Sequence, residues 1–133
     1  NDEMITIKTD VTDIEVLGGT NELTQVIINL INNSKDAFIS NAILIKEISI
    51  SSKIDDGFAL IELQDNAGGI PKENLEKIFE PYFTTKHKSQ GTGLGLFMSK
   101  MICEQGLNGF MDVKSKKGMT NFIIKITLDK HEQ

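Results

Sequence analysis

Apolar residues recur at three- and four-residue intervals in two stretches of this chain. In the first stretch a single stripe holds Leu23, Val26, Ile27, Leu30, Ile31, Ser34, Ala37 and Phe38. This period predicts a helix with one core-facing side, and Thr20 or Asn21 can cap its start. The same period returns at Leu94 and stops at Gly106, which predicts a second helix.

Runs rich in β-branched residues alternate with these helices. Residues 4–8 and 13–17 predict short strands, and residues 110–115 and 120–128 predict two more near the end of the chain. Residues 46–54 and 58–64 predict a hairpin, because Asp55-Asp56-Gly57 between them is a favoured tight turn. The pattern predicts an α+β fold, in which helices cover one face of a mixed, mainly antiparallel sheet.

A long segment between these elements, residues 66–93, follows neither period. Segments of this length in small domains are usually functional loops or disordered. Residues 71–79 are compatible with a short helix. Phe79, Tyr82 and Phe83 group here, where they can anchor a lid that covers a ligand. We expect such a lid over about residues 71–93.

Length and charge limit the alternatives. The chain has 133 residues, 39% of them hydrophobic, which is enough for one domain over residues 1–133. A net charge of −5 argues against nucleic acid or an anionic membrane surface as the main partner. Cys103 is the only cysteine, so an intrachain disulfide is excluded. The chain lacks a run of the ~18 apolar residues that a membrane span needs, and it starts at Asn1. We expect a soluble, cytoplasmic piece of a longer protein, which can itself be anchored in a membrane.

Three polar residues share one face of the first predicted helix. Asn29, Asn33 and Asp36 stand at i, i+4 and i+7, beside the apolar stripe. Amide oxygens are hard, uncharged ligands that suit Mg²⁺, an ion that takes further ligands from water and phosphates. A solvated helix face with surplus asparagines is the alternative interpretation.

Asp65 is predicted to point into the core. Ala59, Ile61 and Leu63 share one side of their strand, and the alternation continues to Asp65. A buried carboxylate needs hydrogen-bond donors, and the exocyclic amine of a purine would be one. The alternative is an aspartate that caps the turn at Ala67.

A glycine-rich segment precedes the second predicted helix. Gly91, Gly93 and Gly95 let backbone N–H groups and the positive end of a helix face a phosphate chain. Lys86 and the neighbouring Thr84 and Thr85 can meet the same phosphates. An ordinary exposed loop is the alternative, because a lone glycine pattern is weak.

Four motifs in order carry a resemblance to a known family. They are N-L-I-N-N-S-K-D-A (29–37), D-N-A-G-G-I (65–70), I-F-E-P-Y-F-T-T-K (78–86) and G-T-G-L-G-L (91–96). Together they resemble the N, G1, F and G2 boxes of the ATP-binding catalytic domain of sensor histidine kinases. The wider family includes Hsp90, type II topoisomerase ATPase domains and mismatch-repair ATPases. The resemblance implies the Bergerat fold, a mixed sheet packed against about three helices.

The resemblance also implies roles for single residues. Asn33 would be the principal Mg²⁺ ligand, with Asn29 assisting, and both would serve catalysis. Asp65 would bind the adenine amino group. The other residues expected to contact ATP are Asp36, Ala67, Gly69, Ile70, Phe83, Lys86, Gly91, Thr92, Gly93, Leu94, Gly95, Leu96 and Thr120. Ala67 stands where many members have glycine, and Asp36-Ala37 where many kinases have a basic residue and tyrosine.

One position separates the subfamilies that this resemblance covers. ATP-hydrolysing relatives carry a water-activating glutamate where this chain has Asn29, and an amide cannot accept the proton. The resemblance therefore implies a protein-histidine kinase that binds Mg-ATP and donates phosphate to a histidine on a separate dimerisation domain. A response regulator would be an indirect partner. A clamp ATPase of the chaperone or topoisomerase kind and an anti-sigma-type serine kinase are the alternatives.

Overall fold

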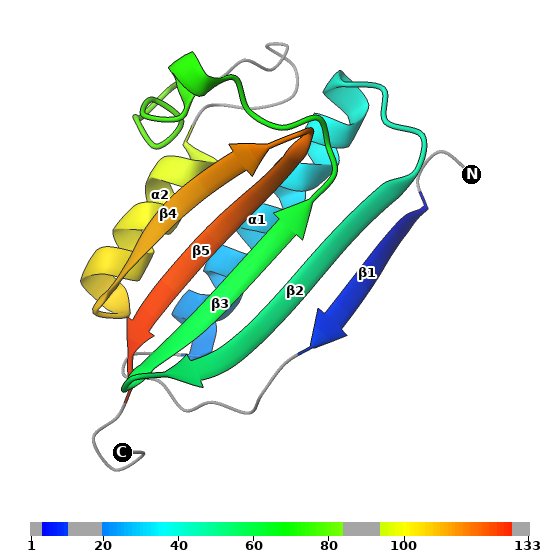
Figure 1. Ribbon diagram of the computed structural model, residues 1–133. Helices are drawn as coiled ribbons and strands as arrows, with labels where there is room; N and C mark the ends of the chain where they lie inside the picture. The colour runs from blue at the N-terminus through cyan, green and yellow to red at the C-terminus, as the bar shows by residue number, and fades with distance from the viewer. Residues whose placement is uncertain (1–3, 11–19, 84–93, 129–133) are drawn as a thin grey trace.

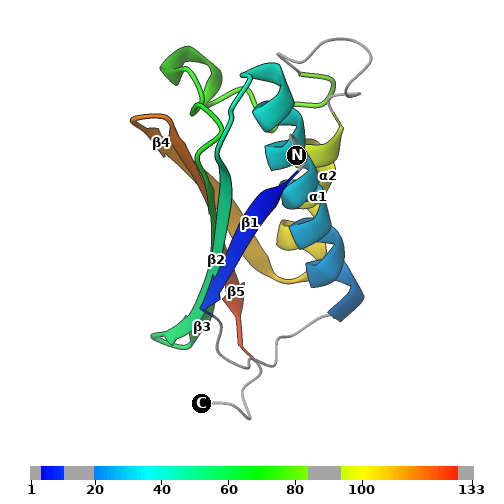
Figure 2. The ribbon, with the colours of Figure 1, turned by 90° about the vertical axis from the view of Figure 1, so that its right-hand side faces the viewer.

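The computed structural model describes residues 4–10, 20–83 and 94–128. It is a two-layer sandwich, in which α1 and α2 lie side by side on one face of a five-stranded sheet (Figures 1 and 2). The opposite face of the sheet carries no described helix in either view. The predicted α+β class is confirmed.

The strands follow the order β1-β2-β3-β5-β4. Their bounds are Ile5–Asp10 (β1), Lys46–Asp55 (β2), Phe58–Asp65 (β3), Gly109–Lys116 (β4) and Met119–Thr127 (β5). β1 is parallel to β2 and every other pairing is antiparallel, so the sheet is mixed and mainly antiparallel as predicted. The predicted strand at 13–17 lies outside the described residues.

The hairpin between β2 and β3 forms where the sequence predicts it. Asp56 and Gly57 both have positive φ, at 52° and 81°. Such a pair fits the right-handed twist of the two strands, and an Asp-Gly step adopts it at little cost. The turn therefore fixes the register that places Asp65 at the far end of β3.

Both predicted helices are present. α1 spans Thr20–Ser40, and α2 spans Gly95–Met101 and continues as a π-helical turn, η3, over Ile102–Gly106. The change of hydrogen bonding at Ile102 was not predicted, because a π-turn leaves no clear signal in the apolar period. Within 71–79, regular helix is limited to the 3₁₀ turn η1, Lys72–Asn74.

The core lies between the helices and the sheet. Val26, Leu30 and Phe38 of α1 are buried there, as predicted from the apolar stripe. They meet the inner faces of the central strands, where alternate residues of β3 and β5 are buried.

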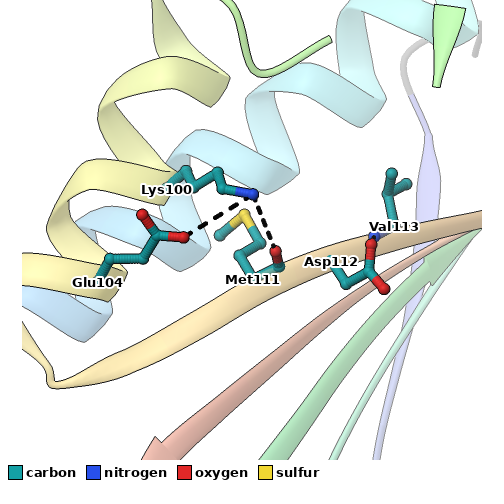
Figure 3. Close-up of polar contacts among 5 residues, drawn as sticks. All are labelled: Lys100, Glu104, Met111, Asp112 and Val113. Atoms are coloured by element: carbon teal, nitrogen blue, oxygen red, sulfur yellow. Dashed lines mark hydrogen bonds and ion pairs between the residues drawn. The ribbon is translucent and has the colours of Figure 1, made fainter. Parts of the chain in front are cut away.

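Lys100 connects α2 to β4 and to the segment that follows β3. Its Nζ lies 3.5 Å from the carbonyl oxygen of Met111 on β4 and 3.8 Å from Glu104 Oε2 (Figure 3). The same ammonium lies 4.6 Å from the centroid of the Phe79 ring. The helix that follows the glycine segment is thus held to the sheet and to the segment that carries the aromatic residues.

Candidate functional site

The motif residues that the structure describes come together at one end of the sheet. The C-terminal end of β3, the turn between β4 and β5, the last turns of α1 and the start of α2 all lie at the top of Figure 1. The segment after β3 curves over the same end. Asp65 is paired in register with Ile48 of β2 and Thr120 of β5, so the strand register sets its neighbours.

Asp65 is the polar centre of this end. Its side chain is only 2% exposed, which confirms the predicted inward direction. Ser34 Oγ donates to Asp65 Oδ2 at 2.5 Å, and the Ala67 N–H donates to Asp65 Oδ1 at 3.1 Å. Burial raises the pKa of the Asp65 carboxyl above its usual value, and these two hydrogen bonds oppose the rise.

The carboxylate of Asp65 has capacity for a further donor. Two oxygens offer about four acceptor positions, and the described residues supply the two hydrogen bonds above. A ligand amine at this point would meet a preformed acceptor in a poorly solvated place. The alternative prediction, that Asp65 caps the turn at Ala67, also holds. Asp65 accepts a hydrogen bond from the N–H of Ala67, two residues later in the chain.

The loop after Asp65 is fixed from both sides. The Gly68 N–H donates to the Gly118 carbonyl at 3.1 Å, and the Ile70 N–H donates to Ser115 Oγ at 2.8 Å. From the other side Asn41 Nδ2 donates to the Ala67 carbonyl at 2.6 Å. Gly68 has a φ of +110°, a conformation that L side chains rarely adopt, which explains a glycine here.

The two asparagines of α1 differ in their surroundings. Asn29 Nδ2 donates to Ser99 Oγ of α2 at 3.0 Å, and Asn29 Oδ1 accepts from Gln25 Nε2 at 2.9 Å. Asn33, one turn later, is half-buried, and none of the hydrogen bonds among the described side chains involves its amide.

The remaining predicted residues divide into two groups. Ala67 and Thr120 are buried next to Asp65, whereas Asp36, Gly69, Ile70, Phe83, Leu94 and Leu96 are half-buried and Gly95 is exposed at the start of α2. The second group, Lys86, Gly91, Thr92 and Gly93, lies outside the described residues, as does the later part of the predicted lid, residues 84–93.

Sequence reasoning missed four polar residues that shape this end: Ser34, Asn41, Ser99 and Ser115. Ser34 sits within the apolar stripe of α1, so its place there could have signalled a buried hydroxyl in need of a partner. The other three contact the site from elements distant in sequence, which no local pattern reveals.

The donor set suits an amide-ligated cation better than a carboxylate cage. Within 4–10, 20–83 and 94–128, no group of three or more His, Cys, Asp or Glu side chains could hold a metal ion. Asn33 offers a neutral oxygen, a ligand that fits Mg²⁺ when phosphates supply the negative charge. The amide oxygen of Asn33 is thus compatible with a Mg²⁺ ion that is bound to phosphates.

Comparison with known proteins decides the family. Residues 18–131 match the sequence model of the family described as histidine kinase-, DNA gyrase B- and HSP90-like ATPase. The chain belongs to this family. The resemblance found in the four motifs is thereby confirmed, and ATP is the nucleotide that membership implies.

Histidine kinases recur among its relatives. The chain is 34% identical to the two-component sensor PprA of Pseudomonas aeruginosa over 116 residues, which are 85% of this chain and 12% of PprA. It is 34% identical to sporulation kinase C of Bacillus subtilis over 101 residues, which are 76% of this chain and 22% of that kinase. The chain thus spans less than a quarter of either curated relative.

A solved structure supports the same assignment. The catalytic domain of histidine kinase ThkA superposes with a TM-score of 0.77 at 28% identity, covering 93% of this chain and 80% of that one. The predicted fold is thereby confirmed as that of histidine kinase catalytic domains.

No helix in the described part of the chain is long and apolar enough to cross a membrane.

Proposed function

We propose that this chain is the Mg-ATP-binding catalytic domain of a two-component sensor histidine kinase. It passes the γ-phosphoryl group of ATP to a histidine on a separate dimerisation domain. The observation that carries the proposal is the buried Asp65 with its two internal donors and its spare acceptor positions, at the end of the sheet where the other motif residues gather.

In this proposal, Asp65 selects adenine. A carboxylate accepts from the exocyclic amine of adenine, whereas guanine presents a carbonyl at that place and would face the carboxylate with an acceptor. Ser34 and the Ala67 N–H hold the carboxylate in one orientation. Thr120, its register partner, adds a buried hydroxyl on the same side.

The metal would be held on the α1 face. Asn33 contributes its amide oxygen, with Asn29 assisting. When bound, Mg²⁺ neutralises charge on the β- and γ-phosphates. α2 begins at Gly95, directly after Leu94. This start of α2 lies at the same end of the sheet (Figure 1).

Position 29 favours transfer over hydrolysis. An asparagine there cannot take a proton from water, so the chain lacks at this position the general base that an ATPase would use. A histidine nitrogen is a nucleophile near neutral pH without such a base. It attacks the γ-phosphorus, the bond from that phosphorus to the β-γ bridging oxygen breaks, and ADP leaves.

The proposed partners follow from this reaction. They are ATP and ADP, the histidine-bearing dimerisation domain, and indirectly a response regulator; nucleic acid is not among them. The domain would work in the cytoplasm, where ATP is available, whether or not the parent protein is anchored in a membrane.

Phosphotransfer in trans tests the proposal. The chain is incubated with γ-labelled ATP and the dimerisation domain of the parent protein, and the labelled product is treated with acid and with base. We expect acid-labile, base-stable phosphate on the dimerisation domain, lost in Asn33→Ala. Rapid release of inorganic phosphate by the isolated chain, abolished by Asn33→Ala, would instead identify a clamp ATPase.

A further inference from the structure

Ser99 is a buried hydroxyl that joins the two helices at the site. Its side chain is 0% exposed, and its Oγ accepts the hydrogen bond from Asn29 Nδ2 at 3.0 Å. The partners are 70 positions apart in the sequence, and the bond crosses from α1 to α2. A serine hydroxyl at a core position of a seven-residue helix costs stability unless it has a partner. Asn29 is that partner.

Both ends of the Asn29 amide are engaged. Its NH₂ group is directed to Ser99 and its oxygen accepts from Gln25, one turn earlier on α1. The amide of exposed Gln25 can turn together with that of Asn29, and Ser99 Oγ can donate as well as accept. The two contacts therefore fix the place of the Asn29 side chain at the contact between α1 and α2, and its oxygen keeps one lone pair for another ligand.

Asn33 provides the contrast. Its amide takes no part in the hydrogen bonds among the described side chains, so its orientation is not preset in this way. Of the two asparagines proposed to meet the metal, Asn29 is the one that the other helix holds in place. Groups that orient a ligand in this manner typically tune its affinity.

We propose that Ser99 is a positioning residue, which holds the Asn29 side chain at the contact between α1 and α2 and so prepares its amide for the metal-nucleotide. The inference rests on the proposed function, because it takes Asn29 to lie beside the metal. Loss of one neutral hydrogen bond predicts a roughly two- to tenfold decrease in Mg²⁺-dependent ATP affinity.

The first measurement uses the nucleotide-free chain. The side-chain ¹⁵N–¹H₂ resonance of Asn29, assigned by comparison with Asn29→Ala, should shift in Ser99→Ala and return toward its original position in Ser99→Thr, which restores the hydroxyl. An Asn29 resonance that is identical in wild type and Ser99→Ala would overturn the inference, whatever the nucleotide results.

The second measurement is a double-mutant cycle on ATP affinity, by titration calorimetry with Mg²⁺ and with EDTA. We expect Ser99→Ala to weaken ATP binding with Mg²⁺, to leave binding in EDTA unchanged, and to have no further effect in the Asn29→Ala background. Asn29→Ala removes the other partner of the same hydrogen bond, and Asn29 is only half-buried. The result therefore does not depend on Ser99→Ala alone folding well.

Ser34→Ala is the matched control, since it also truncates a fully buried serine. It acts at Asp65 and should weaken ATP binding equally with Mg²⁺ and with EDTA. If Ser99→Ala behaves like Ser34→Ala, or keeps its full effect in Asn29→Ala, Ser99 is a packing residue and the inference fails while the proposed function stands. Absence of ATP binding by the wild-type chain would overturn the proposed function itself.

Discussion

Replacing Ser34 with alanine would isolate the contribution of a hydroxyl to the buried carboxylate. The change removes the donor that lies 2.5 Å from Asp65 Oδ2 and leaves the Ala67 N–H as the internal donor. Because Asp65 is 2% exposed, water cannot easily replace the lost bond. The carboxylate would then carry its charge in a poorly solvated place with one donor fewer.

The expected loss is that of a hydrogen bond to a charged group, about 1.5–3 kcal/mol of unfolding free energy. For a domain of this size the melting temperature should fall by roughly 5–15 °C. The loss should depend on pH. Burial already raises the pKa of Asp65 above its usual 3.8, and removing a donor that lowers it should raise it further. As the pH rises through the range of these raised pKa values, Ser34→Ala therefore loses stability relative to wild type. It regains that stability in acid, where Asp65 is protonated in both proteins.

Thermal unfolding followed by circular dichroism at pH 8 and at mildly acid pH measures both quantities. Ser99→Ala is the control, because its equally buried hydroxyl is bonded to the neutral amide of Asn29. Its loss should be about 0.5–1.5 kcal/mol and should not change with pH. Equal losses at the two serines, with no pH dependence at Ser34, would refute the view that Asp65 is a buried charge held by Ser34.

Two further predictions concern backbone and reactivity. Gly68→Ala should destabilise the fold more than Gly118→Ala: both have positive φ, but a Cβ at Gly68 would lie 2.8 Å from Asn41 Nδ2 and one at Gly118 meets nothing within 4 Å. Chemical denaturation measures the difference, expected at about 1 kcal/mol for the lost Asn41 bond; equal losses would show that this contact does not matter. Burial chiefly, with the nearby Glu104 charge, raises the pKa of Cys103 to about 11, so the folded chain should react with iodoacetamide at pH 8 far more slowly than the unfolded chain. Comparable labelling rates would contradict its burial.

Much of the fold could be predicted because its signals are local. The apolar stripe of α1 and the Asp-Gly turn between β2 and β3 each specify an element within a short window. The alternation of buried residues in β3 extended one position further and placed Asp65 inside, as the structure confirms. That single inference located the centre of the site.

The rest depends on contacts between distant segments. The bonds from Asn29 to Ser99 and from Asn41 to Ala67 join elements whose contact is set by packing, and no period in the sequence encodes them. The π-helical turn after Met101 was hidden for a related reason, since its apolar positions also satisfy an ordinary helix. The roles assigned to Asn33 and to the glycines before Gly95 rest on residue chemistry and on the resemblance, and they remain predictions.

A comparison of nucleotide binding by wild type and by Asp65→Asn tests the central claim most directly. ADP and GDP are titrated by calorimetry into wild type and Asp65→Asn, with circular dichroism confirming that both are folded. We predict that wild type binds ADP and not GDP, and that Asp65→Asn loses at least tenfold in ADP affinity. A hydrogen bond to a charged group contributes about 1.5–3 kcal/mol, and about 1.4 kcal/mol corresponds to tenfold. If Asp65→Asn bound ADP as tightly as wild type, or if wild type bound GDP as well as ADP, the account of this site would be wrong.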